Sequence, residues 1–398
     1  MAMQAHRASE GAILPWIEHL LQNHDTAAAF EELAARFKRE KQYRQLFDAR
    51  LMQKRFELGL PLVSSARIGD VPKDLQQAYQ DGYIRAAREV GELILADRNI
   101  PHAWPYFRAV GDTGPIVRAL DAFDVPDPDT PEAQEALGAT IQIAFQDGLH
   151  PRKGFELILK HYGLCRAITM FAAYPQEEGR SDSLRLLVGS LHGQLVENLS
   201  RAISDVEGKQ PENRSIAALI EGRDWLFENN AQYTDSSHIA PVLKLSADLD
   251  DAETLKLAVE IAGYASRLGE MFQYSDDPPF ERAYDDRRIY LEALVGTDVD
   301  RAVRHFDEKA AASDPDRDGY RPAEVLVELL IRVERYDDAI NAFRRYLMDA
   351  APEDLSCPSL LQLCQMARDF KQLREVAKQQ SDPLSYLAAL IQGVRGEG

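Results

Sequence analysis

The chain has no long run of apolar residues, and this absence argues against a membrane-spanning protein. Of its 398 residues, 45% are hydrophobic and 28% are charged. No apolar stretch approaches the roughly 20 residues that a transmembrane helix needs. The first apolar segment, residues 12–21, is interrupted by Pro15 and Glu18 and lacks a basic leader. The sequence therefore predicts a chain that can bury a core, with no membrane partner and no signal peptide.

Cysteine is also scarce. The three cysteines are Cys165, Cys357 and Cys364, an odd number without a C-x-x-C pair. Secreted disulfide scaffolds and zinc modules use cysteine in denser and more regular patterns. We therefore expect reduced thiols in a cytoplasmic protein.

Basic residues are too few to balance the acids. The formal net charge is −19, and residues 231–320 carry 20 acids against 10 bases. Such a chain repels nucleic-acid phosphates and anionic membrane surfaces, so neither is an expected partner. The acidic tract either keeps a surface solvated or attracts a basic partner.

Motifs for catalysis or cofactor binding are missing. The sequence has no G-x-x-x-x-G-K-[ST], no G-x-G-x-x-G after a strand, no H-E-x-x-H and no G-x-S-x-G. We therefore predict no catalytic, cofactor-binding or metal-binding residue. One alternative stays open, a His/Asp metal or acid–base site. Its candidate residues are His150, His161, His238, Asp276, Asp277 and Glu281.

The segment 313–320 resembles the start of a calcium loop, with Asp314, Asp316, Asp318 and Gly319. The last ligand of such a loop would fall on Val325, where a bidentate Glu is required. Asp and Gly also suit a turn without metal. We predict a turn between two helices, with weak calcium binding as the alternative.

Helical periodicity dominates the chain, and alternating strand patterns are scarce. Residues 181–204 place leucines and a valine on one stripe at three- and four-residue spacing. Helix starts are indicated at Asp25-Thr26, Pro131-Glu132 and Asp235-Ser236-Ser237, and helix ends at Gly59 and Gly163. The predicted fold is all-α.

Four regions are expected from the longer connections at 59–72, 124–131, 205–215 and 274–280. They are an N-terminal helical hairpin region (1–58), an irregular helical-hairpin array (72–204), further helical hairpins (214–273) and a repeat region (280–392).

The repeat region contains one helix–turn–helix unit used twice. Ala302, Phe306 and Pro315 recur 37 positions later as Ala339, Phe343 and Pro352. This pattern resembles the tetratricopeptide repeat (TPR), most clearly over residues 284–380. That family pairs a small residue with an aromatic four positions later and ends the unit with proline. The resemblance implies an α–α superhelix, a solenoid of stacked antiparallel helical hairpins that is TPR-like at the C-terminus.

The resemblance also implies a function, because the first helices of such units line a concave surface that binds peptides. We expect a non-enzymatic scaffold that binds a protein or peptide partner on a mixed-charge, overall acidic groove, which would favour a basic peptide. The alternatives are an enzyme or metal-binding protein with a His/Asp site in the concave face, and a self-assembling module. The oligomeric state is not predicted. The expected partner-binding residues are Tyr284, Arg287, Arg288, Arg321, Glu324, Glu328 and Arg332.

Overall fold

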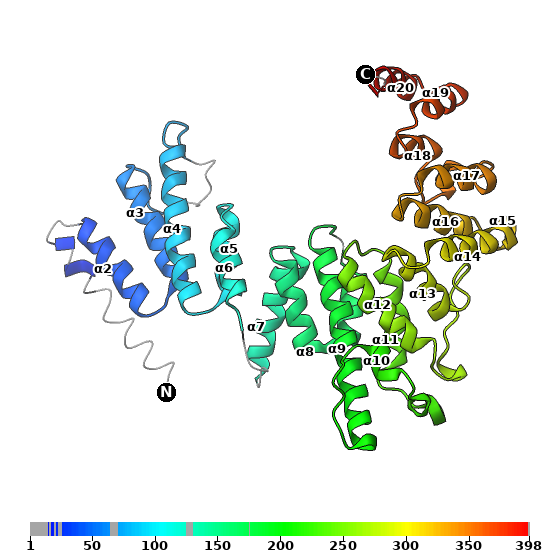
Figure 1. The fold of residues 1–398 in the computed structure, drawn as a ribbon. Coiled ribbons are helices and arrows are strands. Elements are labelled where there is room, and N and C mark those ends of the chain that lie inside the picture. Colours follow the sequence, from blue (N-terminus) through cyan, green and yellow to red (C-terminus); the bar gives the residue numbers. More distant parts are fainter. Residues whose placement is uncertain are drawn as a thin grey trace. The chain divides into compact units, whose positions relative to one another are not determined.

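The computed structural model describes residues 15, 17–19, 21–22, 26–63, 71–124, 130–174 and 176–396 (Figure 1). Every regular element in these residues is a helix, so the all-α prediction is confirmed. The chain divides into two compact units, Met1–Leu157 and Ile158–Gly398. None of the described helices is both apolar enough and long enough to cross a bilayer.

In the first unit most helices contact the next one along the chain. Its core gathers Leu46, Val90, Phe107, Ile116 and Leu120, none of which is exposed to solvent. The helices are α2 (Thr26–Arg39), α3 (Tyr43–Glu57), α4 (Gln76–Ala96), α5 (Ile100–Ala109), α6 (Gly114–Asp121), α7 (Pro131–Ile141) and the π-helical turn η2 (Gln142–Gln146).

Helix α8 (Pro151–Ala172) begins in the first unit and contains a break. Gly163 has φ +74° and ψ 179°, a combination open almost only to glycine. The helix end predicted at this glycine is therefore confirmed as a kink between two helical segments.

The second unit continues with helices whose faces are set by apolar periodicity. The predicted stripe of α9 is buried along its whole length, at Leu184, Leu187, Val188, Leu191, Leu195 and Leu199. The elements are α9 (Arg180–Glu207), α10 (Ile216–Ile220), η3 (Asp224–Asn230), α11 (Ser236–Ser246), α12 (Ala252–Ala265), η4 (Glu270–Phe272), α13 (Ala283–Leu294), α14 (Val299–Ala312), α15 (Pro315–Asp318), α16 (Arg321–Arg332), α17 (Tyr336–Tyr346), η5 (Pro352–Asp354), α18 (Leu360–Met366), α19 (Phe370–Gln379) and α20 (Pro383–Gly396).

Most other predicted helix boundaries are also confirmed. Thr130 caps α7 just before Pro131, and Asp235 caps α11 by accepting the N–H of Ser237. Gly59, at φ +67°, follows the end of α3. Helix α2 starts at Thr26, but Asp25 and the connection residues 64–70 and 125–129 lie outside the described residues. The four-region division of the chain stays a prediction.

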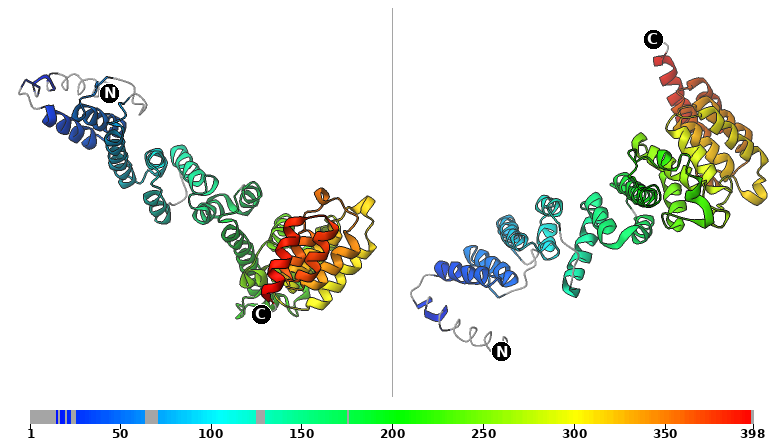
Figure 2. Two further views of the ribbon diagram at one scale, coloured as in Figure 1. Left: turned by 90° about the horizontal axis from the view of Figure 1, so that it is seen from above. Right: turned by 60° about the horizontal axis from the view of Figure 1, so that its bottom comes forward.

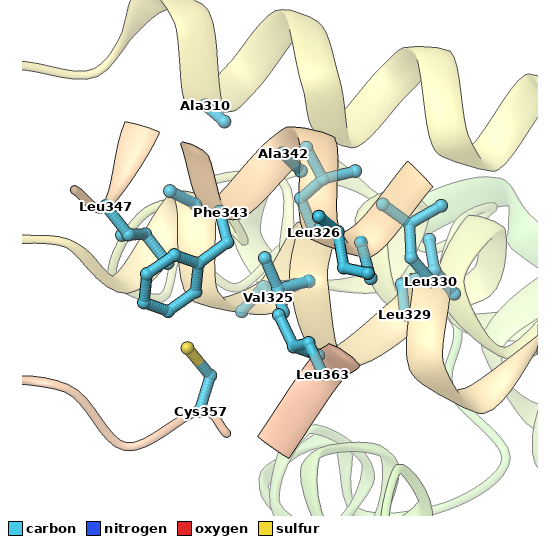
Figure 3. Close-up of a cluster of buried hydrophobic side chains, with 14 of the residues drawn as sticks. Ala310, Val325, Leu326, Leu329, Leu330, Ala342, Phe343, Leu347, Cys357 and Leu363 are labelled. Carbon is cyan, nitrogen blue, oxygen red and sulfur yellow. The ribbon is translucent and has the colours of Figure 1, made fainter. Parts of the chain in front are cut away.

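The C-terminal helices of the second unit pack in neighbouring pairs. Helices α16 to α20 each contact the next one along the chain, and both views of Figure 2 show them side by side. The repeated small and aromatic residues lie in this core: Ala302, Phe306 and Ala339 are at most 1% exposed and Phe343 is 7% exposed. Figure 3 shows Phe343 of α17 packed with side chains of α16 and with Cys357. The sequence repeat therefore corresponds to equivalent buried positions in two successive helix pairs.

The aspartate-rich segment is a short helical turn between α14 and α16. Asp314 caps the four-residue helix α15 by accepting the N–H of Asp316. Asp318 accepts hydrogen bonds from the Arg317 side chain and from the backbone of Asp314, and these lower the pKa of Asp318 to about 2. The predicted turn is confirmed, and two of its three aspartates are occupied by bonds within the turn.

Candidate functional site

The second unit contains a pocket of about 700 Å³. Its walls come from the end of α11 and the residues after it, from the connection before α13, and from α13 and α16, which contact each other. We call it the charged pocket. Its lining residues are Lys244, Leu245, Ala247, Asp248, Asp276, Asp277, Pro278, Phe280, Arg287, Tyr290, Arg321, Val325, Glu328 and Arg332.

Helix α16 supplies one wall through residues that share a helical face. Arg321, Val325, Glu328 and Arg332 follow one another at four-, three- and four-residue spacing and all line the pocket. Val325 is 1% exposed and belongs to the C-terminal core (Figure 3). The pocket wall is therefore anchored to the packed interior of the repeat region.

Helix α13 and the preceding connection supply a second wall. Arg287, which is 6% exposed, stacks over the Phe280 ring at 4.1 Å and donates to Asp276 at 2.7 Å. Burial lowers the pKa of Arg287, although Asp276 acts against that shift. Burial alone would raise the pKa of Asp276, but the hydrogen bond from Arg287 brings that pKa below its ordinary value. This pair joins the connection before α13 to α13 itself.

The two arginines of α16 are held by local acceptors. Arg321 forms a bidentate pair with Glu328, with Nη1–Oε1 at 2.7 Å and Nη2–Oε2 at 3.1 Å. Arg332 donates to the carbonyl oxygens of Ala247, at 2.6 Å, and of Leu249. The bonds of Arg332 join α16 to the segment after α11, whereas the Arg321–Glu328 pair lies within α16.

Three polar groups of the pocket have no bonding partner among the described residues. The carboxylates of Asp248 and Asp277 accept no hydrogen bond and form no ion pair there. The Tyr290 hydroxyl also has no hydrogen-bond partner, although this side chain is only 6% exposed. Burial raises the pKa of Tyr290 to about 12, and the charged groups that affect it, led by Glu328, include Arg332, Arg321 and Asp248. Tyr290 therefore lines the pocket within reach of the charges of these four residues.

Asp248 is exposed to solvent, but partial desolvation by its surroundings raises its pKa, and Arg180 and Arg332 offset this only in part. A carboxylate in this condition is stabilised by a further cation or donor brought close to it.

Four of the seven predicted partner-binding residues line the pocket together: Arg287, Arg321, Glu328 and Arg332. The other three do not line it. Tyr284 is 2% exposed in the core. Arg288 points elsewhere and pairs with Glu292 at 2.7 Å. Glu324 is 5% exposed and accepts hydrogen bonds from Ser356 and Cys357.

Other residues of the pocket were not expected as partner-binding residues. Lys244, Asp248 and Tyr290 were not singled out, and Asp276 and Asp277 were considered only for a metal site. Tyr290 lies one turn beyond Arg287, a spacing that helical periodicity could have used. No local pattern indicates that the end of α11 meets α16, more than 70 residues later.

The candidate histidines have separate partners. His150 bonds Asp121 at 2.6 Å, and His238 lies 3.9 Å from Asp235 at the start of α11. Asp276 bonds Arg287, and Glu281 bonds Lys309. Within the described ranges, no group of three or more His, Cys, Asp or Glu side chains is arranged to hold a metal ion.

Comparison of the chain with protein-family models, with curated proteins and with solved structures gave no match.

Proposed function

We propose that the protein is a non-enzymatic helical-repeat scaffold that binds another polypeptide at the charged pocket. In this proposal the C-terminal helix pairs are units of a TPR-like solenoid, and the pocket lies on its concave, binding face. The recurrence of Ala302 and Phe306 as Ala339 and Phe343, buried in equivalent helices, supports the repeat. The three unbonded cysteines are consistent with a reducing compartment such as the cytoplasm.

The composition of the pocket carries the proposal. Of its 14 lining residues, eight are charged: Lys244, Asp248, Asp276, Asp277, Arg287, Arg321, Glu328 and Arg332. Sites for small molecules are lined mostly by apolar and aromatic side chains with a few polar groups. In this pocket eight charged side chains lie beside apolar surface, a combination that suits polypeptide side chains with an apolar stem and a polar end.

The arginine side chains of the pocket are already held in place, which favours binding of a partner without rearrangement. Its arginines are fixed by Asp276, by Glu328 and by backbone carbonyls, so their side-chain entropy is already lost before a partner arrives. A preorganised surface of this kind loses less free energy on association than a mobile one.

An array of random peptides tests the proposal. We expect the full chain to bind a subset of peptides, and we expect an Ala247→Trp variant, whose indole would fill the pocket, to lose that subset. Ala311 lies exposed on α14 and does not line the pocket, so Ala311→Trp is the matched control. The proposal is wrong if no peptide depends on the pocket, or if both tryptophan variants change binding equally.

A further inference from the structure

We infer that the charged pocket receives a basic side chain, arginine or lysine, of the bound polypeptide; this inference rests on the proposed function. The argument concerns which charges of the pocket are already used within the chain and which are left for a partner.

Most basic groups of the pocket are already bonded to other groups of the chain. Arg321 is neutralised by Glu328, and Arg332 donates to two carbonyls and lies 3.3 Å from Asp250. Arg287 is buried against Phe280 and paired with Asp276, and Lys244 approaches the same Asp276 at 3.5 Å. An anionic ligand would have to compete with carboxylates or carbonyl oxygens for the three arginines.

The polar groups of the pocket that have no such bond can accept hydrogen bonds. Asp248 and Asp277 are carboxylates without a partner among the described residues, and their charges have no matching cation in direct contact. The Tyr290 hydroxyl interacts electrostatically with Glu328, Arg332, Arg321 and Asp248, and its oxygen can accept as well as donate. A guanidinium or ammonium group is the complement of two carboxylates and a hydroxyl oxygen.

The Tyr290 side chain separates this site from an ordinary acidic surface. It is only 6% exposed, and its hydroxyl has no hydrogen-bond partner among the described residues and is open to the pocket. A donor from a ligand would supply the hydrogen bond that this hydroxyl lacks within the chain. Acidic surface clusters without such a group are stabilised by water alone.

The acidic residues of the surrounding segment also favour a basic ligand. The segment from 231 to 320, which supplies two walls of the pocket, carries 20 acids against 10 bases. The negative electrostatic potential of such a segment raises the local concentration of basic peptide segments and speeds their association, most strongly at low salt.

Three small probes test the inference with the full chain: N-acetyl-arginine methylamide, its neutral isostere N-acetyl-citrulline methylamide, and N-acetyl-glutamate methylamide. Affinities are measured by saturation-transfer NMR. We expect the arginine probe to bind about tenfold more tightly than the citrulline probe, the effect of roughly one charge-assisted contact. The glutamate probe should bind more weakly than both.

Variants then locate the binding. Asp248→Asn should weaken the arginine probe about fivefold or more, and Tyr290→Phe by a smaller factor, about two- to threefold. Glu253→Gln is the matched control, because Glu253 is an exposed acid of α12 outside the pocket. Thermal unfolding followed by circular dichroism establishes that each variant is folded, and a second substitution, Asp277→Asn, replaces Asp248→Asn if that variant does not fold.

Three results would overturn the inference: preferred binding of glutamate, equal binding of arginine and citrulline, or a loss in Glu253→Gln as large as in Asp248→Asn. If array peptides depend on the pocket but show no preference for arginine or lysine, this inference fails while the proposed function stands. If no array peptide depends on the pocket, the proposed function itself fails.

Discussion

Oε1 of Glu324, on α16, accepts a hydrogen bond from the Ser356 hydroxyl at 2.9 Å, across 32 positions of sequence. The same oxygen accepts the backbone N–H groups of Ser356 and, at 3.2 Å, of Cys357. One buried carboxylate thus ties the connection before α18 to α16. A residue expected on the binding surface instead holds two helix pairs of the second unit together.

Replacing Glu324 should therefore change stability and leave binding intact. We expect Glu324→Ala to lower the free energy of unfolding by about 2–4 kcal/mol, because the buried N–H of Cys357 and the N–H and hydroxyl of Ser356 lose their acceptor. Glu324→Gln keeps an acceptor oxygen and should cost about 1 kcal/mol. Urea unfolding measures both, with the exposed Glu353→Ala as control. A Glu324→Gln protein that is fully folded but binds no pocket-dependent peptide would contradict this assignment.

A second prediction concerns a buried carboxylate between α13 and α14. Asp286 is 2% exposed and bonds His305 at 2.8 Å and Lys309 at 3.0 Å, and it also accepts the N–H of Arg282. Removing one member of a buried ionic network leaves the others desolvated without compensation. We expect Asp286→Ala to cost about 3–5 kcal/mol.

The control for this prediction is Asp300→Ala, which removes an exposed ion pair with Arg335. Surface pairs contribute about 0–1 kcal/mol, so this variant should unfold close to the parent. Equal unfolding midpoints for the two variants in urea would show that Asp286 does not join the helices as the contacts indicate.

Two glycines provide a matched test of backbone conformation. Gly163 breaks α8 at φ +74°, and no atom lies within 4 Å of the position where a Cβ would be placed. Gly163→Ala should therefore destabilise by about 1–3 kcal/mol through backbone strain alone. Gly189, inside α9, also has open space but no positive φ, so Gly189→Ala should stabilise by roughly 0.5–1 kcal/mol. Differential scanning calorimetry should show transitions that shift in opposite directions, and a shared direction would contradict the kink.

Local patterns predicted the helices but only part of the site, for a physical reason. The face of α9 and the ends at Gly59 and Gly163 follow from periodicity and from glycine conformation, which act within a few residues. On α16, the spacing of Arg321, Glu328 and Arg332 likewise indicated one face. Glu324 belongs to the same helix, but the connection around Ser356 covers it, and that contact depends on tertiary packing.

The pocket residues that the sequence patterns did not indicate have the same explanation. Asp248 and Tyr290 line the same pocket because α11 contacts α13 and α13 contacts α16. No residue near Asp248 in the sequence indicates this arrangement, because the order in which helices pack determines it. Sequence patterns therefore identified the arginines of the site and missed the groups to which we assign recognition.

The last prediction concerns alkaline pH and the buried Tyr264. This residue is 0% exposed, its oxygen accepts the N–H of Tyr233 at 2.9 Å, and burial raises its pKa from 10.0 to about 12. Between these two values the unfolded chain releases the phenolic proton while the folded chain keeps it. The stabilisation is thus complete below pH 10 and is lost as the pH rises through about 12, by roughly 2–3 kcal/mol.

Tyr264→Phe removes this titration but also leaves the Tyr233 N–H without its acceptor, which costs about 1 kcal/mol at any pH. We expect the variant to be less stable than the parent at pH 9 and the difference to shrink or reverse at pH 12, in urea unfolding at constant ionic strength. Tyr274→Phe, at a residue that is 52% exposed, is the control and should follow the parent at both pH values. A parent and Tyr264→Phe variant that lose stability in parallel above pH 10 would show that Tyr264 is not shielded as its contacts indicate.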